Sequence, residues 1–322
     1  MYKLKLLLLA IVAVTVVSCR SNDKKKVEKK AAASVTGPRI NNPVTDDFAV
    51  TGTHLQVFKT FLKGLDENVI DNAAVAAQKF QDLFKGDDAL TRDTALILFN
   101  KFDVSLADKA DAAHGKDTTI QYDSLLTDSN GIHSNKISAK TARYDRLLKT
   151  NGLRVASEEG ETFIVQDLDF EIKWFKDKLS APLQQYLTES AKEDKEGLAE
   201  DAGLVISPKR LAERAIWWEN FLKNNPGTIV SVQAKYNWDG DIEILLTGMD
   251  NSPVLTYNPF SFQDNYAEAF QYLQNTYPHS DTNKIISPFY QLAVKKDSTG
   301  IKKLLEQYKT RGIISQSEAS HG

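Results

Sequence analysis

The sequence predicts a mainly α-helical fold, either a multi-helix bundle or a stack of helical hairpins, with one small β-hairpin near residues 153–165. Two observations predict the helices. From about residue 50, apolar side chains recur at steps of three and four, and several of these segments begin or end at recognisable capping residues. One observation predicts the hairpin: two short β-prone runs lie on either side of a turn that contains glycine.

The N-terminal helical region, residues 47–152, is expected to hold four helices. The fourth, Lys140–Lys149, ends at Asn151-Gly152, which is a good C-terminal stop. Residues 114–136 are polar and are expected to form a long surface connection. In the first three helices the repeating apolar residues are Leu55, Phe58, Leu62 and Leu65, then Val69, Ala73, Ala76, Phe80 and Leu83, then Leu96, Phe99, Phe102 and Leu106.

The second region, residues 153–314, combines the hairpin with further helices. Leu153–Ala156 and Thr162–Val165 flank Glu158-Glu159-Gly160, and such a hairpin must pack on the helices around it to be stable. Ser207-Pro208 marks a helix start, with Ser as the N-cap. Helical character returns at Phe170 and Trp174, and later helices are expected at 182–195, 208–224, 228–238, 259–277, 285–295 and 301–308, followed by a polar tail, residues 315–322. Ile242, Leu245, Leu246 and Met249 extend the apolar face of the 228–238 helix.

Two segments of this region are similar to each other. Phe221-Leu222-Lys223-Asn224-Asn225-Pro226 resembles Tyr272-Leu273-Gln274-Asn275-Thr276-Tyr277-Pro278, and an amphipathic helix follows each. This pattern resembles the tetratricopeptide-like helical repeats of envelope lipoproteins over 207–296. Pro226 and Pro278 are 52 residues apart, against ~34 in the standard repeat, so 239–259 would be an insertion. Any helical hairpin can use such a stop, which is the alternative interpretation.

The first nineteen residues carry a processing signal. Lys3 and Lys5 precede an apolar run of twelve residues, 6–17, which is short of the ~20 that span a bilayer. Val16-Val17-Ser18-Cys19 resembles the lipobox of bacterial lipoproteins. The resemblance implies that residues 1–18 are a signal peptide, that Cys19 receives a diacylglyceryl thioether and that the new amino terminus is acylated. The alternative is a plain secretory peptide or an uncleaved anchor.

Residues 19–46 are expected to form the lipidated cysteine and a flexible basic tether. Its lysines could lie against anionic headgroups, although a solvated tether is the favoured interpretation. Arg20 follows the cysteine, and no acidic residue stands there to favour retention in the inner membrane. We therefore expect an outer-membrane location facing the periplasm, with the membrane as a partner through the lipid on Cys19.

Charge and chemistry exclude several function classes. Beyond residue 30 the chain holds 32 basic and 41 acidic residues, so nucleic acid is not an expected partner. The single cysteine cannot form an intramolecular disulfide or a cysteine-based zinc site. The chain has no H-E-x-x-H, no G-x-S-x-G and no glycine-rich phosphate loop. No cofactor and no catalytic residue is therefore nominated, and acidic pairs such as Glu193-Asp194 are expected on solvated faces.

Two small sets of residues are candidate sites. Asp239, Asp241 and Glu243 could hold a cation, but the Asp-Gly pair at 239–240 is also common turn chemistry. Trp217 and Trp218 are adjacent, so on a helix they point ~100° apart. One of them could line a binding groove; the more common arrangement has one in the core and the other half covered.

These observations favour a non-catalytic binding protein, an adaptor or assembly factor anchored in the cell envelope with an envelope protein as its partner. The alternative is an enzyme or carrier that acts on a small envelope molecule, a glycan or a lipid. Its natural site would be the hairpin at 153–165 and the acidic loop at 239–243. A purely structural spacer is the third possibility.

Overall fold

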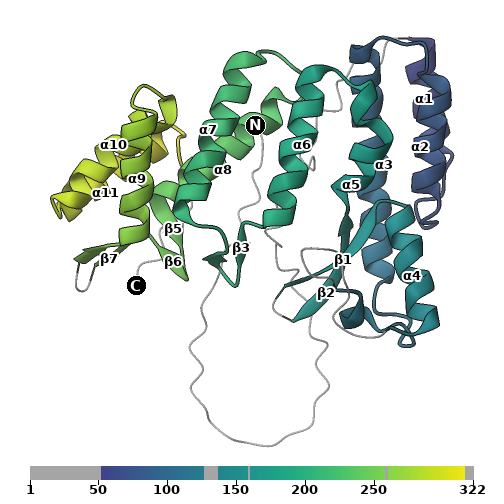
Figure 1. Ribbon diagram of the computed structural model, residues 1–322, viewed down its shortest axis with the longest axis horizontal. Coiled ribbons are helices and arrows are strands. Elements are labelled where there is room, and N and C mark those ends of the chain that lie inside the picture. The colour runs from purple at the N-terminus through teal and green to yellow at the C-terminus, as the bar shows by residue number, and fades with distance from the viewer. Residues whose placement is uncertain (1–51, 127–136, 159, 258–259, 316–322) are drawn as a thin grey trace, which may run out of the picture.

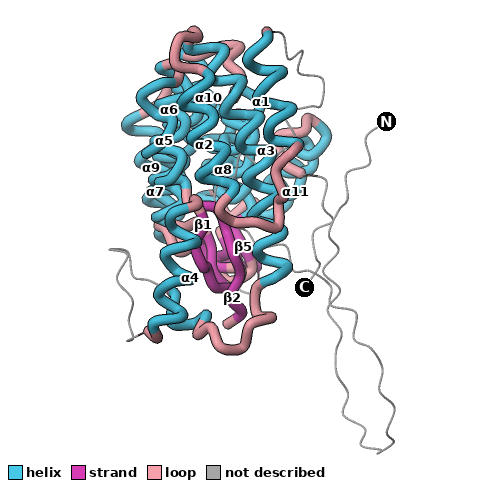
Figure 2. Tube along the Cα trace, turned by 90° about the vertical axis from the view of Figure 1, so that its right-hand side faces the viewer, coloured by secondary structure: helices cyan, strands magenta, loops and turns pink. Residues whose placement is uncertain are grey.

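The computed structural model describes residues 52–126, 137–158, 160–257 and 260–315. Within them it has eleven α-helices and four two-stranded antiparallel sheets, which confirms the mainly α prediction. The helices lie side by side in a row that follows the chain from α1 at one end of the molecule to α9, α10 and α11 at the other (Figure 1). The strands gather toward one end of the helices (Figure 2).

The N-terminal part is built around one long helix, which begins where Asp88 accepts a hydrogen bond from the Thr91 backbone N–H at 2.9 Å. The rings of Phe58, Phe80 and Phe84 pack against one another, and Phe80 also meets Phe175 at 4.7 Å between centroids. The helices are α1 (Thr53–Lys63), α2 (Asn72–Leu83), α3 (Ala89–Ala113) and α4 (Ala139–Thr150), with a short 3₁₀ turn at Tyr122–Leu125. Part of the predicted polar connection, residues 127–136, lies outside the described residues.

The predicted hairpin is confirmed as β1 (Leu153–Glu158) paired with β2 (Glu161–Gln166). It packs on α3 and α4, as an isolated hairpin must. The predicted stop before it is also confirmed. Gly152 has a φ of +71°, and a Cβ there would meet the Phe170 ring at 2.8 Å, so glycine is required by both conformation and space.

The rest of the chain is a series of helices joined by short turns. The predicted N-cap is confirmed, because Ser207 Oγ accepts a hydrogen bond from the Arg210 backbone N–H at 3.1 Å. The helices are α5 (Leu168–Phe175), α6 (Ala181–Glu196), α7 (Pro208–Asn224), α8 (Ser231–Thr247), α9 (Asp264–Thr276), α10 (Asp281–Val294) and α11 (Ser298–Thr310), with a 3₁₀ turn at Lys176–Lys178. Pro226 and Pro278 thus follow the first helices of two successive helical pairs, α7–α8 and α9–α10.

Two expectations about this part are wrong. α8 does not end at Trp238 but continues through 239–240 to Thr247, because Ala234, Ile242 and Leu245 form one continuous buried face. Three hairpins besides the predicted one also occur in the described residues. They are β3 (Ala199–Glu200) with β4 (Gly203–Leu204), β5 (Gly248–Met249) with β6 (Ser252–Pro253), and β7 (Leu255–Tyr257) with β8 (Phe260–Phe262).

The buried apolar side chains form two clusters that meet at α7. Trp218 and Phe221 belong to the cluster that extends back to α1, whereas Leu211 and Ala215 belong to the cluster that extends to α11. The predicted division at residue 152 does not separate the two clusters, since Leu148 and Leu153 on either side of it both belong to the first one. The α7 helix therefore joins the two parts of the molecule.

Candidate functional site

The α7 helix carries both tryptophans that the sequence nominated. Trp218 has no exposed surface, and its Nε1–H donates to Glu193 Oε2 at 3.3 Å. Trp217 is partly exposed, and its ring stacks on Phe221 with 5.4 Å between centroids. Trp218 therefore cannot line an open groove, because it is part of the core. Only Trp217 reaches the surface.

Two residues that precede Trp217 on α7, Lys209 and Glu213, act on Tyr272 of α9. Lys209 Nζ lies 5.0 Å from the centre of the Tyr272 ring, and the rings of Tyr272 and Tyr277 meet edge to face at 5.8 Å. Glu213 stands one turn before Trp217 and acts electrostatically on Tyr272. Partial burial, the hydrogen bond with Tyr277 and the Glu213 charge raise the pKa of Tyr272 to about 12. We call Lys209, Glu213, Trp217, Tyr272 and Tyr277 the α7–α9 strip.

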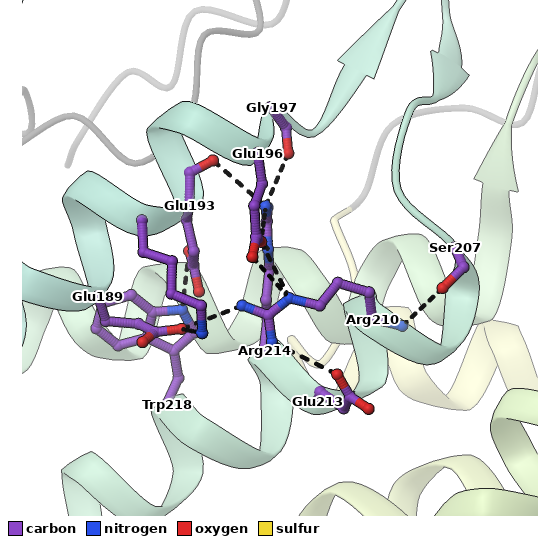
Figure 3. A network of polar contacts seen from close by, with 10 residues as sticks. Glu189, Glu193, Glu196, Gly197, Ser207, Arg210, Glu213, Arg214 and Trp218 are labelled. Atoms are coloured by element: carbon purple, nitrogen blue, oxygen red, sulfur yellow. Dashed lines mark hydrogen bonds and ion pairs between the residues drawn. The ribbon is translucent and has the colours of Figure 1, made fainter. Parts of the chain in front are cut away.

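The inner side of α7 is joined to α6 by two arginines (Figure 3). Arg214 is 1% exposed and donates from Nη2 to Glu196 Oε2 and to the Gly197 carbonyl, each at 2.8 Å. Arg210 donates from Nε to Glu196 at 3.0 Å and from Nη2 to Glu189 at 3.3 Å. The last carbonyls of a helix lack hydrogen-bond partners within that helix. By donating to the Gly197 carbonyl, Arg214 caps the end of α6, and Glu196 balances the charge of the arginine.

Two buried carboxylates lie within electrostatic reach of these arginines. They are Glu193 of α6 and Asp241 of α8, which are 3% and 7% exposed. Glu193 Oε1 and Asp241 Oδ2 have no hydrogen-bond partner among the described residues. Burial raises the pKa of Glu193 to about 7, with Arg214 opposing the rise. Burial and the neighbouring Glu193 charge raise the pKa of Asp241 well above its usual range.

A second buried acidic pair lies in the N-terminal part. Asp103 of α3 and Glu171 of α5 are each 2% exposed. Gln166 Nε2 donates to Asp103 Oδ2 at 2.5 Å, and Asn100 Nδ2 donates to Glu171 Oε2 at 3.4 Å. Burial raises the pKa of Asp103 to about 7 and, together with the Asp103 charge, that of Glu171 to about 8.

The Tyr186 side chain of α6 is buried near one acid of each pair. Its pKa is raised by burial and by the charges of Glu171 and Glu193, so it lies within electrostatic reach of both. Sequence reasoning missed both pairs and placed Glu193 on a solvated face, which is wrong. The sequence does contain a signal for the contact between α6 and α7. Acids recur at 189, 193 and 196, and arginines at 210 and 214, so each set lies on one face of its helix at steps of three and four.

The nominated cation ligands do not form one site. Asp239, Asp241 and Glu243 all lie on α8, where residues two apart point ~200° from each other. Asp239 pairs with Lys235, Asp241 is buried, and Glu243 accepts a hydrogen bond from Ser315. The described parts of the chain contain no group of three or more His, Cys, Asp or Glu side chains that could hold a metal ion.

The two elements nominated for a small-molecule site are also separate. The hairpin β1–β2 packs on α3 and α4, whereas 239–243 are a turn of α8, which packs on α7 and α10. A shallow hollow does lie between α5 and α6. Its lining residues are Ile172, Thr188, Ala191, Lys192, Lys195 and Glu196.

None of the helices in the described ranges is long and apolar enough to cross a membrane. Cys19, the signal segment and the tether lie outside the described residues. Comparison of the chain with protein-family models, with curated proteins and with solved structures finds no match.

Proposed function

We propose that this chain is a lipid-anchored cell-envelope protein that binds a partner protein, as an adaptor or assembly factor, and does not catalyse a reaction. The anchor is the lipid expected on Cys19, which would hold the protein on the outer membrane facing the periplasm. The support for the anchor is in the sequence: the lysines at 3 and 5, the apolar run and Val16–Cys19. Two or three acyl chains hold a protein durably, since each buried methylene contributes about 0.8 kcal/mol.

The α7–α9 strip is the observation that carries the binding proposal. Trp217 is partly exposed on a helix whose other faces are largely buried, and its ring already rests on Phe221. Covering such a ring costs little further side-chain entropy, and preorganised tryptophan and tyrosine side chains dominate the binding energy of many protein interfaces. The stacking of α7–α8 on α9–α10 supports the same proposal, because stacked helical pairs offer extended surfaces to peptides and proteins.

Crosslinking in intact cells, followed by mass spectrometry of the captured proteins, tests the binding proposal. We expect the wild-type chain to capture one protein in near-equal amount and Trp217→Ala to capture at least tenfold less. Tyr236→Ala is the matched control, because Tyr236 is an aromatic residue of α8, 62% exposed, that lies outside the strip. Equal capture by Trp217→Ala and the wild type would remove the strip from the proposal.

The anchor is tested separately by growing cells with an alkyne fatty acid and detecting the label on the chain. We expect the wild type to be labelled and to sediment with membranes. Cys19→Ser should lose the label and should retain the longer, unprocessed amino terminus. A labelled Cys19→Ser protein would show that the lipid is elsewhere, whatever the crosslinking result.

The alternative function, an enzyme or carrier for a small envelope lipid or glycan, has one observation in its favour, the hollow between α5 and α6. Both of its lysines are already paired, Lys192 with Glu189 and Lys195 with Asp169. Native mass spectrometry of protein extracted from membranes tests it. A bound lipid or glycan that is lost in Thr188→Trp, which would fill the hollow, would favour the carrier.

A further inference from the structure

The turn between α10 and α11 is rich in lysine. Lys295 and Lys296 lie in this turn, and Lys302 and Lys303 lie in the second turn of α11, all four of them exposed. Residues 294–303 hold these four lysines and one aspartate, a net charge of +3, whereas the whole chain has a net charge of −3. The α11 end of the row of helices therefore carries positive charge on a protein that is acidic as a whole (Figure 1).

These four lysines are not neutralised by neighbouring acids. Within the described residues, none of the four forms an ion pair. The one acid among them, Asp297, accepts a hydrogen bond from the Gly300 backbone N–H at 2.8 Å and so caps α11. By contrast, Lys284 near the start of α10 is paired with Asp281 at 2.6 Å. The turn thus presents a local surplus of positive charge to its surroundings.

Apolar side chains are exposed beside the lysines. Val294, the last residue of α10, is 59% exposed, and Tyr257, the last residue of β7, is 45% exposed. Lys302 Nζ lies 5.6 Å from the centre of the Tyr257 ring, which brings the β7–β8 hairpin next to α11. The Tyr257 ring also meets the Phe260 ring edge to face at 6.0 Å between centroids. We call the following set the C-terminal basic surface: Tyr257, Val294, Lys295, Lys296, Lys302 and Lys303.

The composition of this surface favours a lipid bilayer over a protein as its partner. Protein interfaces are enriched in arginine and depleted in lysine, and all four cations here are lysines. A lysine is a point charge on a flexible stem, so it pairs with a phosphate group without needing a matched geometry. Aromatic and aliphatic side chains beside lysines are typical of surfaces that lie at the boundary between headgroups and acyl chains. The surface therefore matches the anionic headgroups of a bilayer in both charge and side-chain type.

We infer that the C-terminal basic surface docks on the anionic headgroups of a phospholipid bilayer. This inference rests on the anchor of the proposed function for one step only, which is that the bilayer is close. The chain between Cys19 and Gly52, the first described residue, spans at most ~120 Å when fully extended. A lipid on Cys19 would keep the bilayer within that distance, so even a weak surface would bind it as an intramolecular event.

Docking would fix how the protein lies on the membrane. The tether precedes α1 and the basic surface includes part of α11, and these two helices are at opposite ends of the row (Figure 1). With both ends held, the row would lie along the bilayer instead of standing away from it. The helices between the ends would then stay close to the membrane surface.

Acetylation of the lysines in the lipidated full chain tests the inference. The protein, extracted from membranes with its lipid, is inserted into vesicles of phosphatidylcholine alone or of phosphatidylcholine with phosphatidylglycerol. Mass spectrometry then measures the labelling of each lysine. We expect Lys302 and Lys303 to be labelled at least threefold less on the anionic vesicles than on the neutral ones, with the difference lost at high salt. Lys284, near the other end of α10 and 64% exposed, should be labelled equally on both.

Two double variants separate this surface from a general effect of positive charge. Lys302→Gln with Lys303→Gln should remove the protection of the two remaining lysines of the surface on anionic vesicles. Arg143→Gln with Arg146→Gln is the control and should leave that protection unchanged. It removes two exposed cations from α4, where the described residues expose no large apolar side chain.

Equal labelling of the wild type on the two kinds of vesicle, or equal protection in the two double variants, would overturn the inference. Protection in intact cells that is absent on anionic vesicles would also overturn it, by assigning the surface to an acidic protein. Flotation with neutral vesicles reports the anchor separately, because only the lipid holds the chain there. For a chain without lipid, flotation with anionic vesicles at low salt would still support the basic surface, and no flotation would overturn it.

Discussion

The two buried acidic pairs differ in what surrounds them. Asp103 and Glu171 are approached by side-chain amides, from Gln166 and Asn100, and no Lys or Arg of the described residues forms an ion pair with them. Glu193 and Asp241 lie beside Arg210 and Arg214, which are bound to other acids. In both places burial raises the carboxylate pKa values, so nearby arginines do not ensure ionisation.

Removing Arg214 should have the largest effect on stability. Arg214→Met keeps most of the volume, but it leaves the Glu193 and Gly197 carbonyls without their donor and removes the nearest positive charge from Glu193. Breaking a buried ion pair in this way costs about 3–5 kcal/mol. Urea unfolding measures the loss. Lys284→Met, which breaks an exposed pair with Asp281, is the control and should cost less than ~1 kcal/mol. Equal losses of stability in the two variants would mean that the bonds of Arg214 do not stabilise the end of α6.

The pair without arginines should dominate the dependence of stability on pH. Burial raises the pKa of Glu171 from its ordinary value of 4.5 to about 8 in the folded chain. The folded state therefore holds a proton that the unfolded state releases, and this stability is fully present below about pH 4.5 and is lost as pH rises through 8. Glu171→Gln should remove the Glu171 part of this slope, leaving the part due to Asp103, and should raise the free energy of unfolding at pH 8 by on the order of 2 kcal/mol.

Urea midpoints at pH 5, 6, 7 and 8 test this expectation in the wild type and in Glu171→Gln. Glu306→Gln is the control, since Glu306 is an exposed acid paired with Lys309, and it should keep the wild-type slope. An unchanged slope in Glu171→Gln would show that Glu171 stays ionised in the folded protein.

The smallest effect on stability is expected for Lys192, the positive side chain that pairs with Glu189 of α6. The Lys192 side chain is 50% exposed and meets Glu189 at 3.2 Å, while Glu189 keeps its bond to Arg210. Lys192→Met should therefore change the free energy of unfolding by less than ~1 kcal/mol, as measured by urea unfolding at low and high salt. A larger loss that disappears in high salt would mean that Lys192 balances the buried acids more than its exposure suggests.

Local signals predicted most of the fold. The helices followed from apolar spacing, the hairpin from its glycine turn, and the start of α7 from Ser207-Pro208, because each depends on residues close together in the sequence. The turn at 239–240 was wrong because burial of Ile242 and Leu245 overrides the local preference of Asp-Gly. The three missed hairpins have strands of two or three residues, too short to show alternation.

The candidate site was less predictable. Trp217 at the surface and Trp218 in the core follow from adjacency on a helix, but the sequence does not say which is which, since that depends on where α6 packs. The position of Glu193 likewise depends on arginines 17 and 21 residues away: Arg210 binds acids of the same helix, and Arg214 caps the end of that helix. Such pairings are tertiary and become visible only when the helices are placed together.

The small hairpins also have a mechanical consequence. The tips of β3–β4 and β5–β6 are joined by a hydrogen bond from the Asn251 N–H to the Ala202 carbonyl at 2.9 Å and by another from the Leu204 N–H to Ser252 Oγ at 2.9 Å. The chain enters α7 and leaves α8 at this point, so the two helices form a loop with its ends fastened together. A force that pulls the two hairpins apart would act on these few bonds before it reached α7 and α8.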